Sequence, residues 1–184
     1  AEKWQKSLDS LESQDRKTRK TNEIKIIANA DDPLIAHLGL HFKRSVTYFG
    51  INDKTKYLEK MEHATDSIFC LNCGTRLKYE GIYFSHIGIW KCPTCGEKRP
   101  NPTISEWKSP LPGLYNQYNT LAAVAVAKSL HIKPTLENFK PSFGRQEEID
   151  IDGKIIKIFL SKNPAGFNQS LRTVIELGAK QLLL

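Results

Sequence analysis

The sequence predicts an α/β protein with a mostly parallel sheet that is interrupted by a small ribbon, a β-hairpin that carries cysteines. Three observations lead to this prediction. Short runs rich in β-branched residues alternate with longer helical patterns, which is typical of strands joined by crossover helices. One helical segment is apolar on every side, as expected for a helix buried against a sheet. Four cysteines lie between the first strands and that helix, in two pairs with metal-ligand spacing.

The length and composition are those of one folded domain with at most a small insert. The chain has 184 residues, of which 40% are hydrophobic and 26% are charged. No apolar run approaches the roughly 18 residues of a membrane span, and the N-terminal AEKWQKSLDS lacks the apolar stretch of a secretory signal. We therefore expect a cytoplasmic protein without a transmembrane segment. The net charge of +7 is spread along the chain, so nucleic acid is not the expected partner.

The first third of the chain predicts alternating helices and strands. Trp4, Leu8 and Leu11 have helical spacing, and a polar loop follows them. The next elements are a buried strand (24–28), a turn (29–33) whose Pro33 opens a helix, a second strand (46–51) and a short helix (56–62).

The remainder predicts one central helix followed by further strands and a helix. The Pro-rich residues 97–113 are expected to be extended, and residues 116–131, which contain LAAVAVA, should form the buried central helix. The later elements are strands at 149–151 and 154–160 around the Asp152-Gly153 turn, a helix at 167–177 and a last strand at 181–184.

The four cysteines are spaced to hold one metal ion. Two residues separate Cys70 from Cys73, eighteen residues follow, and Cys92 and Cys95 repeat the short spacing. Each short spacing allows one tight turn to aim two sulfurs at the ion, and two turns complete a tetrahedron of thiolates. Because four thiolates leave no open coordination position, we predict a structural Zn²⁺ site.

The residues around the cysteines predict the ribbon. Gly74 and Gly96 follow the two pairs and can adopt positive φ where the chain leaves each turn. The segment between the pairs is rich in β-formers, so we expect a hairpin over residues 76–91 with its turn at Glu80-Gly81. Two disulfides, an iron–sulfur cluster and a redox-active Cys-x-x-Cys are the alternatives. The five histidines are expected to be surface or packed side chains: His37, His41, His63, His86 and His131.

Four motifs outside the ribbon occur in an order typical of one enzyme family. They are NADDP (29–33), GLYNQYNTLAA (113–123), FGRQE (143–147) and KNPAGFNQ (162–169). Over residues 26–184 the chain resembles the central, ATP-binding domain of the Mur ligases. The four-cysteine insert, with IYFSHIGIWKCPTCG at 82–96, narrows the resemblance to the ligase-like subunits of glutamine-hydrolysing lipid II isoglutaminyl synthases.

The resemblance implies nucleotide contacts for residues in two of these motifs. Asn116 and Asn119 occupy the segment in which the family places an asparagine amide against adenine, and an amide offers both a donor and an acceptor. Helix capping is the alternative role. Arg145 matches the family arginine that reaches the phosphate or ribose side, and its alternative is an ion pair with Glu147 or Glu148.

The KNPAG segment departs from typical Mur ligases. Lys162 stands where those enzymes have a histidine, and Phe159 stands where they have the aspartate that binds ribose. The isoglutaminyl synthase subunits share the KNPAG form, so the resemblance keeps Lys162 as a nucleotide-facing residue. Asp31 and Asp32 follow a strand end, where α/β sheets bind ligands, but a turn and a helix cap explain them equally well.

The function that the resemblance implies belongs to a larger protein. The family's Gly-rich phosphate loop and its magnesium-binding glutamate and histidine have no match here, so we expect this chain alone not to hydrolyse ATP. In the intact enzyme, ATP and Mg²⁺ would activate the D-glutamate α-carboxylate of lipid II as an acyl phosphate. Ammonia from a glutaminase partner would displace phosphate and give D-isoglutamine, at the inner face of the membrane.

Three parts are therefore expected: an N-terminal helix and loop outside the resemblance (1–22), a partial central domain (23–184) and a zinc ribbon inserted within it (68–98). The second hypothesis is a binding module without catalysis. In this hypothesis the ribbon binds nucleic acid or protein through charge and stacking by Lys78, Lys91, Tyr79, Tyr83 and Trp90.

Overall fold

The structure is a computed structural model that describes residues 3–4, 6–10, 13, 24–42, 45–63, 65–141 and 145–183. The described residues among the first thirteen are helical, in agreement with the predicted N-terminal helix. Trp4 in this helix is 68% exposed. Leu11 and the predicted polar loop lie outside the described residues.

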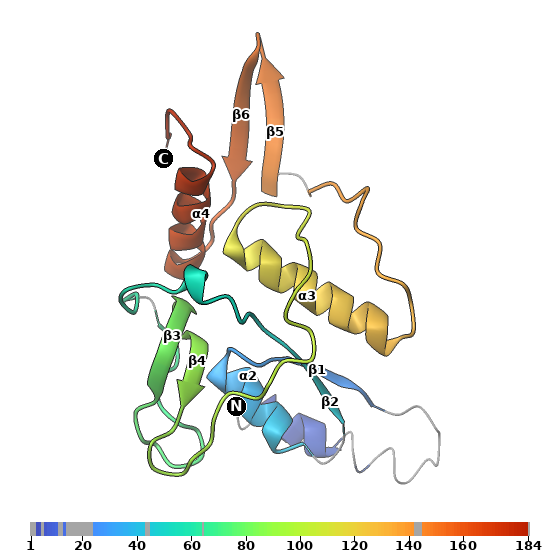
Figure 1. The fold of residues 1–184 in the computed structure, drawn as a ribbon, viewed down its shortest axis with the longest axis vertical. Coiled ribbons are helices and arrows are strands. Elements are labelled where there is room, and N and C mark those ends of the chain that lie inside the picture. Colours follow the sequence, from blue (N-terminus) through green and yellow to red (C-terminus); the bar gives the residue numbers. More distant parts are fainter. Residues whose placement is uncertain are drawn as a thin grey trace.

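A parallel strand pair forms the base of the fold. β1 (Ile26–Asn29) pairs in parallel with β2 (Val46–Phe49), and α2 (Pro33–Leu40) connects the two strands (Figure 1). This β-α-β unit agrees with the predicted strand, turn, helix and strand. Beyond β2, Ile104 forms a single parallel bridge with Phe49. The Pro-rich segment is therefore extended, as predicted, and continues the parallel arrangement by one position.

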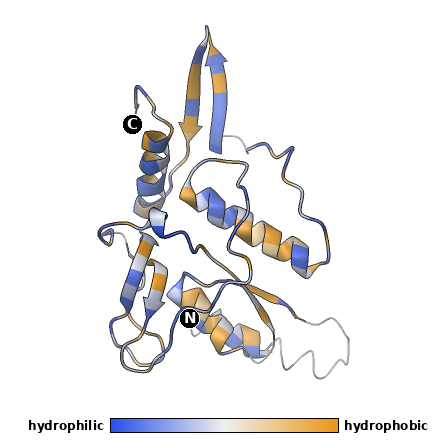
Figure 2. Ribbon diagram, viewed as in Figure 1, coloured by the Kyte–Doolittle hydropathy of each residue, from blue (hydrophilic) through white to orange (hydrophobic). Residues whose placement is uncertain are grey.

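Helix α3 (Leu114–Ser129) packs on this pair with one face. Its buried Leu121, Val124 and Ala125 join the main hydrophobic core. On another face, Val126 is 45% exposed, although Figure 2 shows how hydrophobic the middle of this helix is. The helix is packed on strands, as predicted, but part of its apolar surface is left uncovered because the described chain supplies a layer on only one side of it.

The ribbon hairpin is formed by β3 (Lys78–Phe84) and β4 (Ile87–Lys91), which pair in antiparallel fashion. The predicted turn at Glu80-Gly81 is wrong, because both residues stay inside β3. The ring of Tyr57 occupies the space beside Gly81, where an added Cβ would lie 2.2 Å from ring atoms. The chain turns instead at Ser85, whose φ is 48°.

Gly88 in β4 lies directly against the backbone of β3. A Cβ added at Gly88 would lie 2.3 Å from the carbonyl oxygen of Gly81 and 3.0 Å from Cα of Ile82. Because these are backbone atoms of the paired strand, they move only if the hairpin opens. Gly88→Ala is therefore expected to lower the free energy of unfolding by about 1–3 kcal/mol in urea titrations. Lys91→Ala at the exposed end of β4 is the control, and equal losses in the two variants would contradict the steric explanation.

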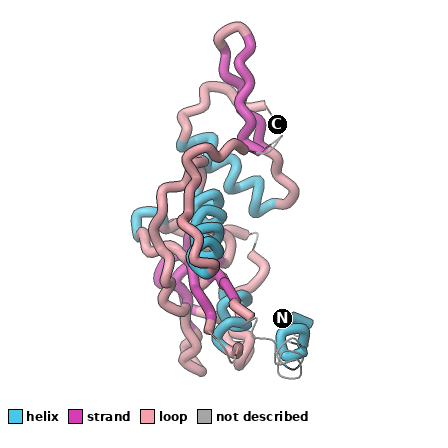
Figure 3. The backbone as a smooth tube through the Cα atoms, turned by 90° about the vertical axis from the view of Figure 1, so that its right-hand side faces the viewer, coloured by secondary structure: helices cyan, strands magenta, loops and turns pink. Residues whose placement is uncertain are grey.

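A second hairpin projects from the rest of the fold (Figures 1 and 3). β5 (Arg145–Ile151) and β6 (Lys154–Phe159) pair around the predicted Asp152-Gly153 turn, whose φ values are 51° and 75°. Two successive positive φ values are typical of a type I′ hairpin turn. Five isoleucines of this hairpin are between 37% and 58% exposed: Ile149, Ile151, Ile155, Ile156 and Ile158.

Helix α4 (Pro164–Glu176) follows the hairpin and packs against the start of α3. Asn163 caps it, since Asn163 Oδ1 accepts a hydrogen bond from the backbone N–H of Gly166 at 2.7 Å. Gly113, the residue before α3, has a φ of 93°, and a Cβ at this position would lie 2.4 Å from Thr173 Oγ1. The close approach of α3 and α4 therefore requires glycine there.

Three further predictions need correction. The described strand pairs other than β1–β2 are antiparallel, so the α/β class holds but the described sheet is not mostly parallel. A 3₁₀ turn, η1 (Lys54–Lys56), replaces the helix predicted at 56–62, because Leu58 N–H donates to Ile82 O in β3 at 2.7 Å. Residues 181–183 form no strand, and Leu183 is 97% exposed.

Candidate functional site

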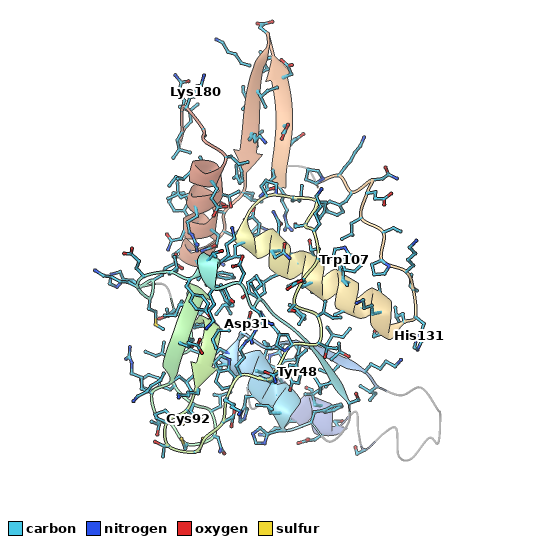
Figure 4. The ribbon with its side chains drawn as sticks, in the orientation of Figure 1. Asp31, Tyr48, Cys92, Trp107, His131 and Lys180 are labelled. Carbon is cyan, nitrogen blue, oxygen red and sulfur yellow. The ribbon has the colours of Figure 1, made fainter. Side chains whose placement is uncertain are left out.

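The four cysteine thiols meet at the end of the ribbon that Cys92 marks in Figure 4. Cys70 Sγ lies 3.5 Å from Cys95 Sγ, Cys73 Sγ lies 3.4 Å from Cys92 Sγ, and all four sulfurs lie within 4.8 Å of one another. Sulfurs that surround a tetrahedral Zn²⁺ at about 2.3 Å lie about 3.8 Å apart. The spacing therefore suits one ion. The cysteines are free, and their sulfurs are too far apart for the disulfide alternative.

Two equivalent turns hold the cysteines. Cys70 N–H donates to Thr75 O at 2.8 Å, and Cys92 N–H donates to Glu97 O at 2.7 Å, five residues ahead in each case. Gly74 and Gly96 have φ values of 72° and 78°, as predicted. Because no atom lies within 4 Å of a Cβ added at either glycine, the positive φ and not the available space favours glycine there.

The surroundings of the thiols favour a bound cation. Burial raises the pKa of Cys70 to about 12. Hydrogen bonds from Thr75 lower the pKa of Cys73 to about 6, and a backbone hydrogen bond from Glu97 lowers the pKa of Cys95. A cation would offset the cost of burying Cys70 as a thiolate. Four thiolates with this spacing fit a soft divalent ion such as Zn²⁺.

The ribbon is fixed to the parallel pair by a buried tryptophan and a backbone hydrogen bond. Trp90 is 2% exposed, and its Nε1–H donates to Ala30 O at 3.0 Å. Gly88 N–H donates to Asp31 O at 2.9 Å. Trp90 also packs with Ala36 of α2 and with Tyr48 of β2. The metal-binding end of the ribbon is thus held in a fixed position relative to β1 and α2.

Asp31 is a fully buried carboxylate at the end of β1 and lies near the centre of Figure 4. Its Oδ1 accepts a hydrogen bond from Arg99 Nε at 2.5 Å. Its Oδ2 accepts from the Ile51 backbone N–H at 2.8 Å and from the Tyr118 hydroxyl at 2.6 Å. Burial raises the pKa of Asp31, and the charge of Arg99 opposes this shift. Both oxygens already have protein donors, so Asp31 links β1, the ribbon exit and α3.

Asp32 caps α2, since its Oδ1 accepts a hydrogen bond from the Leu34 backbone N–H at 2.8 Å. Asp31 and Asp32 were considered either as ligand-binding residues or as turn and helix-cap residues. The contacts of both side chains fit a structural role.

Two of the nucleotide motifs meet at the carbonyl oxygen of Pro112. Asn116 Nδ2 donates to this oxygen at 2.7 Å, and Gln146 Nε2 donates to it at 3.0 Å. Gln146 Nε2 also donates to the Tyr115 hydroxyl at 2.5 Å. The Asp31–Tyr118 hydrogen bond adds NADDP, whereas α4 contacts Gly113 through Thr173, which lies four residues beyond the KNPAGFNQ motif. Three of the four motifs therefore meet at the start of α3: NADDP, GLYNQYNTLAA and FGRQE.

The four residues expected to face the nucleotide are only partly brought together. Asn116 is 7% exposed, and Asn119, one turn later, donates from Nδ2 to Asn116 Oδ1 at 3.4 Å. Arg145 is exposed at the base of the second hairpin, opposite Phe159. Lys162 is also exposed, and no described contact joins it to the other three.

Two cavities border the start of α3. The first has a volume of about 410 Å³ and is lined by residues that include Gln146, Lys157 and Phe159. The second has a volume of about 620 Å³ and is lined by residues that include Trp107, Gln117 and Arg172. Leu111 lines both cavities. The meeting point of Asn116 and Gln146 lies beside the smaller one, because Pro112 also lines it.

Gln146 is a candidate that the sequence alone did not single out. It lies at a bulge in β5 with a φ of 59°, it is 7% exposed, and its Oε1 has no hydrogen-bond partner within the described parts of the chain. Bulges often re-aim a side chain next to a functional site. A buried amide oxygen without a donor costs about 1–3 kcal/mol, which a ligand N–H or O–H would offset. Nothing in the residue types of FGRQE predicts the bulge or the positive φ of Gln146.

The fold is similar to that of a cell-wall peptide ligase. The similarity is to the structure of a pseudomurein peptide ligase type C from Methanothermus fervidus, with a TM-score of 0.66 and 32% sequence identity. It covers 81% of this chain and 34% of that ligase. The described part of the chain thus has an α/β fold similar to part of that ligase. No family model matches the chain.

Similarity to curated proteins is more specific. The chain is 29% identical over 180 residues to the lipid II isoglutaminyl synthase (glutamine-hydrolyzing) subunit MurT of Streptococcus pneumoniae (strain ATCC BAA-255 / R6), covering 85% of this chain and 40% of that protein. It is 29% identical over 188 residues to the MurT subunit of Staphylococcus aureus (strain COL), covering 89% and 42%. Over the matched residues this chain is MurT-like, which confirms the predicted resemblance. The chain spans about two fifths of the length of these relatives.

None of the described helices is both long enough and apolar enough to cross a membrane.

Proposed function

We propose that this chain is part of the central, ATP-binding domain of a MurT-type amide ligase. The complete enzyme amidates the D-glutamate of lipid II to D-isoglutamine, with ammonia supplied by a glutaminase partner. The observation that carries the proposal is the meeting of three family motifs, NADDP, GLYNQYNTLAA and FGRQE, around the start of α3, in a chain that is MurT-like over most of its length. Residues 23–184 are assigned to this domain, and residues 68–98 to the ribbon within it.

The nucleotide is assigned to the smaller cavity at the start of α3. The amide of Gln146, which lines this cavity, offers a donor and an acceptor for the adenine edge, and Asn116 holds the carbonyl of Pro112 that positions Gln146. Asn119 does not line the cavity but lies beside Asn116, whose Oδ1 its Nδ2 reaches at 3.4 Å, and we assign it to the same nucleotide. Arg145 and Lys162 are exposed cations of the family motifs, and we assign them to the phosphate or ribose side. ATP with Mg²⁺, when bound, supplies the phosphoryl group that activates the carboxylate. The residues of this chain bind and orient the nucleotide.

We propose that the described parallel strands form part of a larger sheet in the complete protein. β1, β2 and the bridge at Ile104 run parallel, and α3 leaves an apolar face with Val126 uncovered. A further layer of the complete protein would bury this face.

Zinc at the four cysteines is assigned a structural role. The ion would hold the two turns together. The hydrogen bonds of Trp90 to Ala30 and of Gly88 to Asp31 would fix the ribbon to the end of β1. Four thiolates leave no open position, so the residues of this site have no part in the chemical step.

A nucleic-acid module is less well supported by the positions of the ribbon aromatics. Tyr83 is fully buried and Trp90 is 2% exposed, while the hydroxyl of Tyr79 donates to His86 O at 2.9 Å. Stacking of bases requires exposed ring faces. Lys78 and Lys91 remain exposed, but charge alone gives weak and salt-sensitive binding.

The nucleotide assignment is tested with Asn119→Ala in the complete protein that contains this chain. Asn119 is exposed and makes only one long side-chain hydrogen bond, so the fold should be retained. Loss of its amide contact is expected to weaken ATP binding about tenfold in calorimetric titrations. Gln117→Ala is the matched control, because Gln117 lies on the same helix and lines the larger cavity.

Unchanged ATP affinity in Asn119→Ala, or an equal loss in Gln117→Ala, would contradict the assignment of Asn119 to the nucleotide. If the complete protein bound single-stranded DNA in a salt-dependent way and did not bind ATP, the binding-module hypothesis would replace the ligase proposal.

A further inference from the structure

Two histidines of α2 and a glutamate of the ribbon form a second cluster of metal-ligand atoms. His37 Nδ1 lies 2.8 Å from Glu97 Oε1, and His41 Nε2 lies 3.6 Å from Glu97 Oε2. The two imidazole ring centroids are 4.2 Å apart. One ligand atom from each residue lies within 4.8 Å of the other two. The cluster shares no ligand with the four-cysteine site.

The fold brings the three residues together for identifiable reasons. His37 and His41 are four residues apart on and just after α2, so they lie on one helix face. Glu97 follows the second cysteine turn, where its carbonyl oxygen accepts the Cys92 N–H at 2.7 Å. The same turn that would hold zinc therefore directs Glu97 toward α2. The expectation that these histidines are surface or packed side chains did not include this contact, because Glu97 is 60 positions away from His37 in the sequence.

Burial and access at the cluster suit a bound ion that keeps an open position. The side chains of Glu97 and His37 are 11% and 17% exposed, so both are mostly shielded from water. The side chain of His41 is 47% exposed, which leaves a route from solvent. Three protein ligands with access for water are the arrangement typical of open, exchangeable metal sites.

We propose that His37, His41 and Glu97 form a second metal site, which takes a divalent transition-metal ion of the Zn²⁺ class. Two imidazoles and one carboxylate are ligands that Zn²⁺ and its neighbours in the first transition row accept, whereas Mg²⁺ and Ca²⁺ favour oxygen ligands alone. Ligand atoms around a tetrahedral ion at about 2.0–2.1 Å lie about 3.3 Å apart. The observed separations of 2.8 Å and 3.6 Å lie on either side of this value.

Both oxygens of Glu97 face an imidazole nitrogen, which a single histidine–glutamate hydrogen bond would not require. An ion at this position would tie α2 to the ribbon, and it would bind only after the second cysteine turn has formed. The proposal does not depend on nucleotide binding or on the amidation reaction.

The test is a count of zinc ions per chain by native mass spectrometry, on the full-length protein exposed to micromolar Zn²⁺. The wild-type protein should bind two zinc ions. His41→Ala should bind one, with affinity for the second ion weakened more than about 100-fold, because loss of an outer-shell partner alone costs about 10–100-fold. His63→Ala is the matched control, since His63 is an exposed histidine outside the cluster, and it should keep both ions.

A second readout locates the weaker ion. After one equivalent of Zn²⁺ has filled the cysteine site, Co²⁺ should produce visible d–d absorption without the thiolate charge-transfer band of a cysteine-bound ion. The proposal is overturned if the wild-type protein binds only one zinc ion, if His41→Ala keeps two, or if His63→Ala loses the second ion equally. If the wild-type protein binds a single ion that His41→Ala retains and Cys92→Ser loses, the result supports the four-cysteine site and contradicts the site at His37, His41 and Glu97.

Discussion

Cys92→Ser is expected to lose the bound zinc and to disorder the two cysteine turns of the ribbon, with a decrease in the free energy of unfolding of more than about 4 kcal/mol. Cys92 is 3% exposed, and its sulfur faces Cys73 at 3.4 Å, so no other side chain can replace it without moving the turn. Structural zinc contributes about 10–16 kcal/mol in small zinc domains. Trp90 still anchors the ribbon to Ala30 in the variant, so we expect a loss below that range.

The measurements are zinc content by elemental analysis and thermal unfolding with and without a chelator. Thr94→Ser, inside the same turn, is the control and should keep one zinc at the cysteine site and the wild-type melting temperature. A Cys92→Ser protein with full zinc content, or one that loses zinc and melts like the wild type, would show that the metal does not hold the ribbon.

Removing either member of the buried Asp31–Arg99 pair is the second change with a large expected effect. Asp31 is fully buried, and the side chain of Arg99 is 9% exposed. Arg99→Ala would leave the carboxylate without its countercharge, and Asp31→Ala would leave the guanidinium without its own. Loss of one partner of such a pair costs about 3–5 kcal/mol. We expect this loss in urea unfolding of each single variant.

The double variant Asp31→Ala with Arg99→Ala should lose less than the sum of the two single variants, because no uncompensated buried charge is left. Glu80→Ala is the matched control. It removes an ion pair of similar length, Lys54–Glu80 at 2.8 Å, between two exposed side chains and should leave stability unchanged. Strict additivity of the two buried-site losses would show that Asp31 and Arg99 are not coupled.

Local signals in the sequence predicted the elements whose causes are local. The β-α-β unit was predicted from an apolar run and from Pro33 at the start of the helix. The four-cysteine cluster followed from spacing and from Gly74 and Gly96, whose positive φ values agree with the prediction. The Asp152-Gly153 turn was also correct, because its residues favour two successive positive φ values.

The wrong predictions concern features that depend on contacts far along the chain. The ribbon turns at Ser85 because Tyr57 packs against Gly81, and no pattern within the hairpin indicates that contact. The predicted helix at 56–62 is replaced because Leu58 bonds to Ile82 of β3. The apolar run of α3 correctly predicted a helix packed on strands, but it did not indicate that Val126 is left exposed on a face that no second layer covers within the described residues.

Only part of the candidate site could be predicted from the sequence. Asn116 and Asn119 lie together as expected, whereas the buried Gln146 depends on a bulge that its motif does not reveal. The cluster of His37, His41 and Glu97 depends on how the ribbon packs against α2. Such packing is a tertiary property, which short-range spacing does not encode.

The measurement that tests the proposed function most directly is ATP-dependent amidation of lipid II by the complete protein together with its glutaminase partner. The product is identified by mass spectrometry of the released peptide. We predict conversion of D-glutamate to D-isoglutamine that requires ATP and Mg²⁺, with ammonium able to replace glutamine when the partner is omitted. Folded, zinc-loaded protein that converts no lipid II with either nitrogen source would contradict the proposed function.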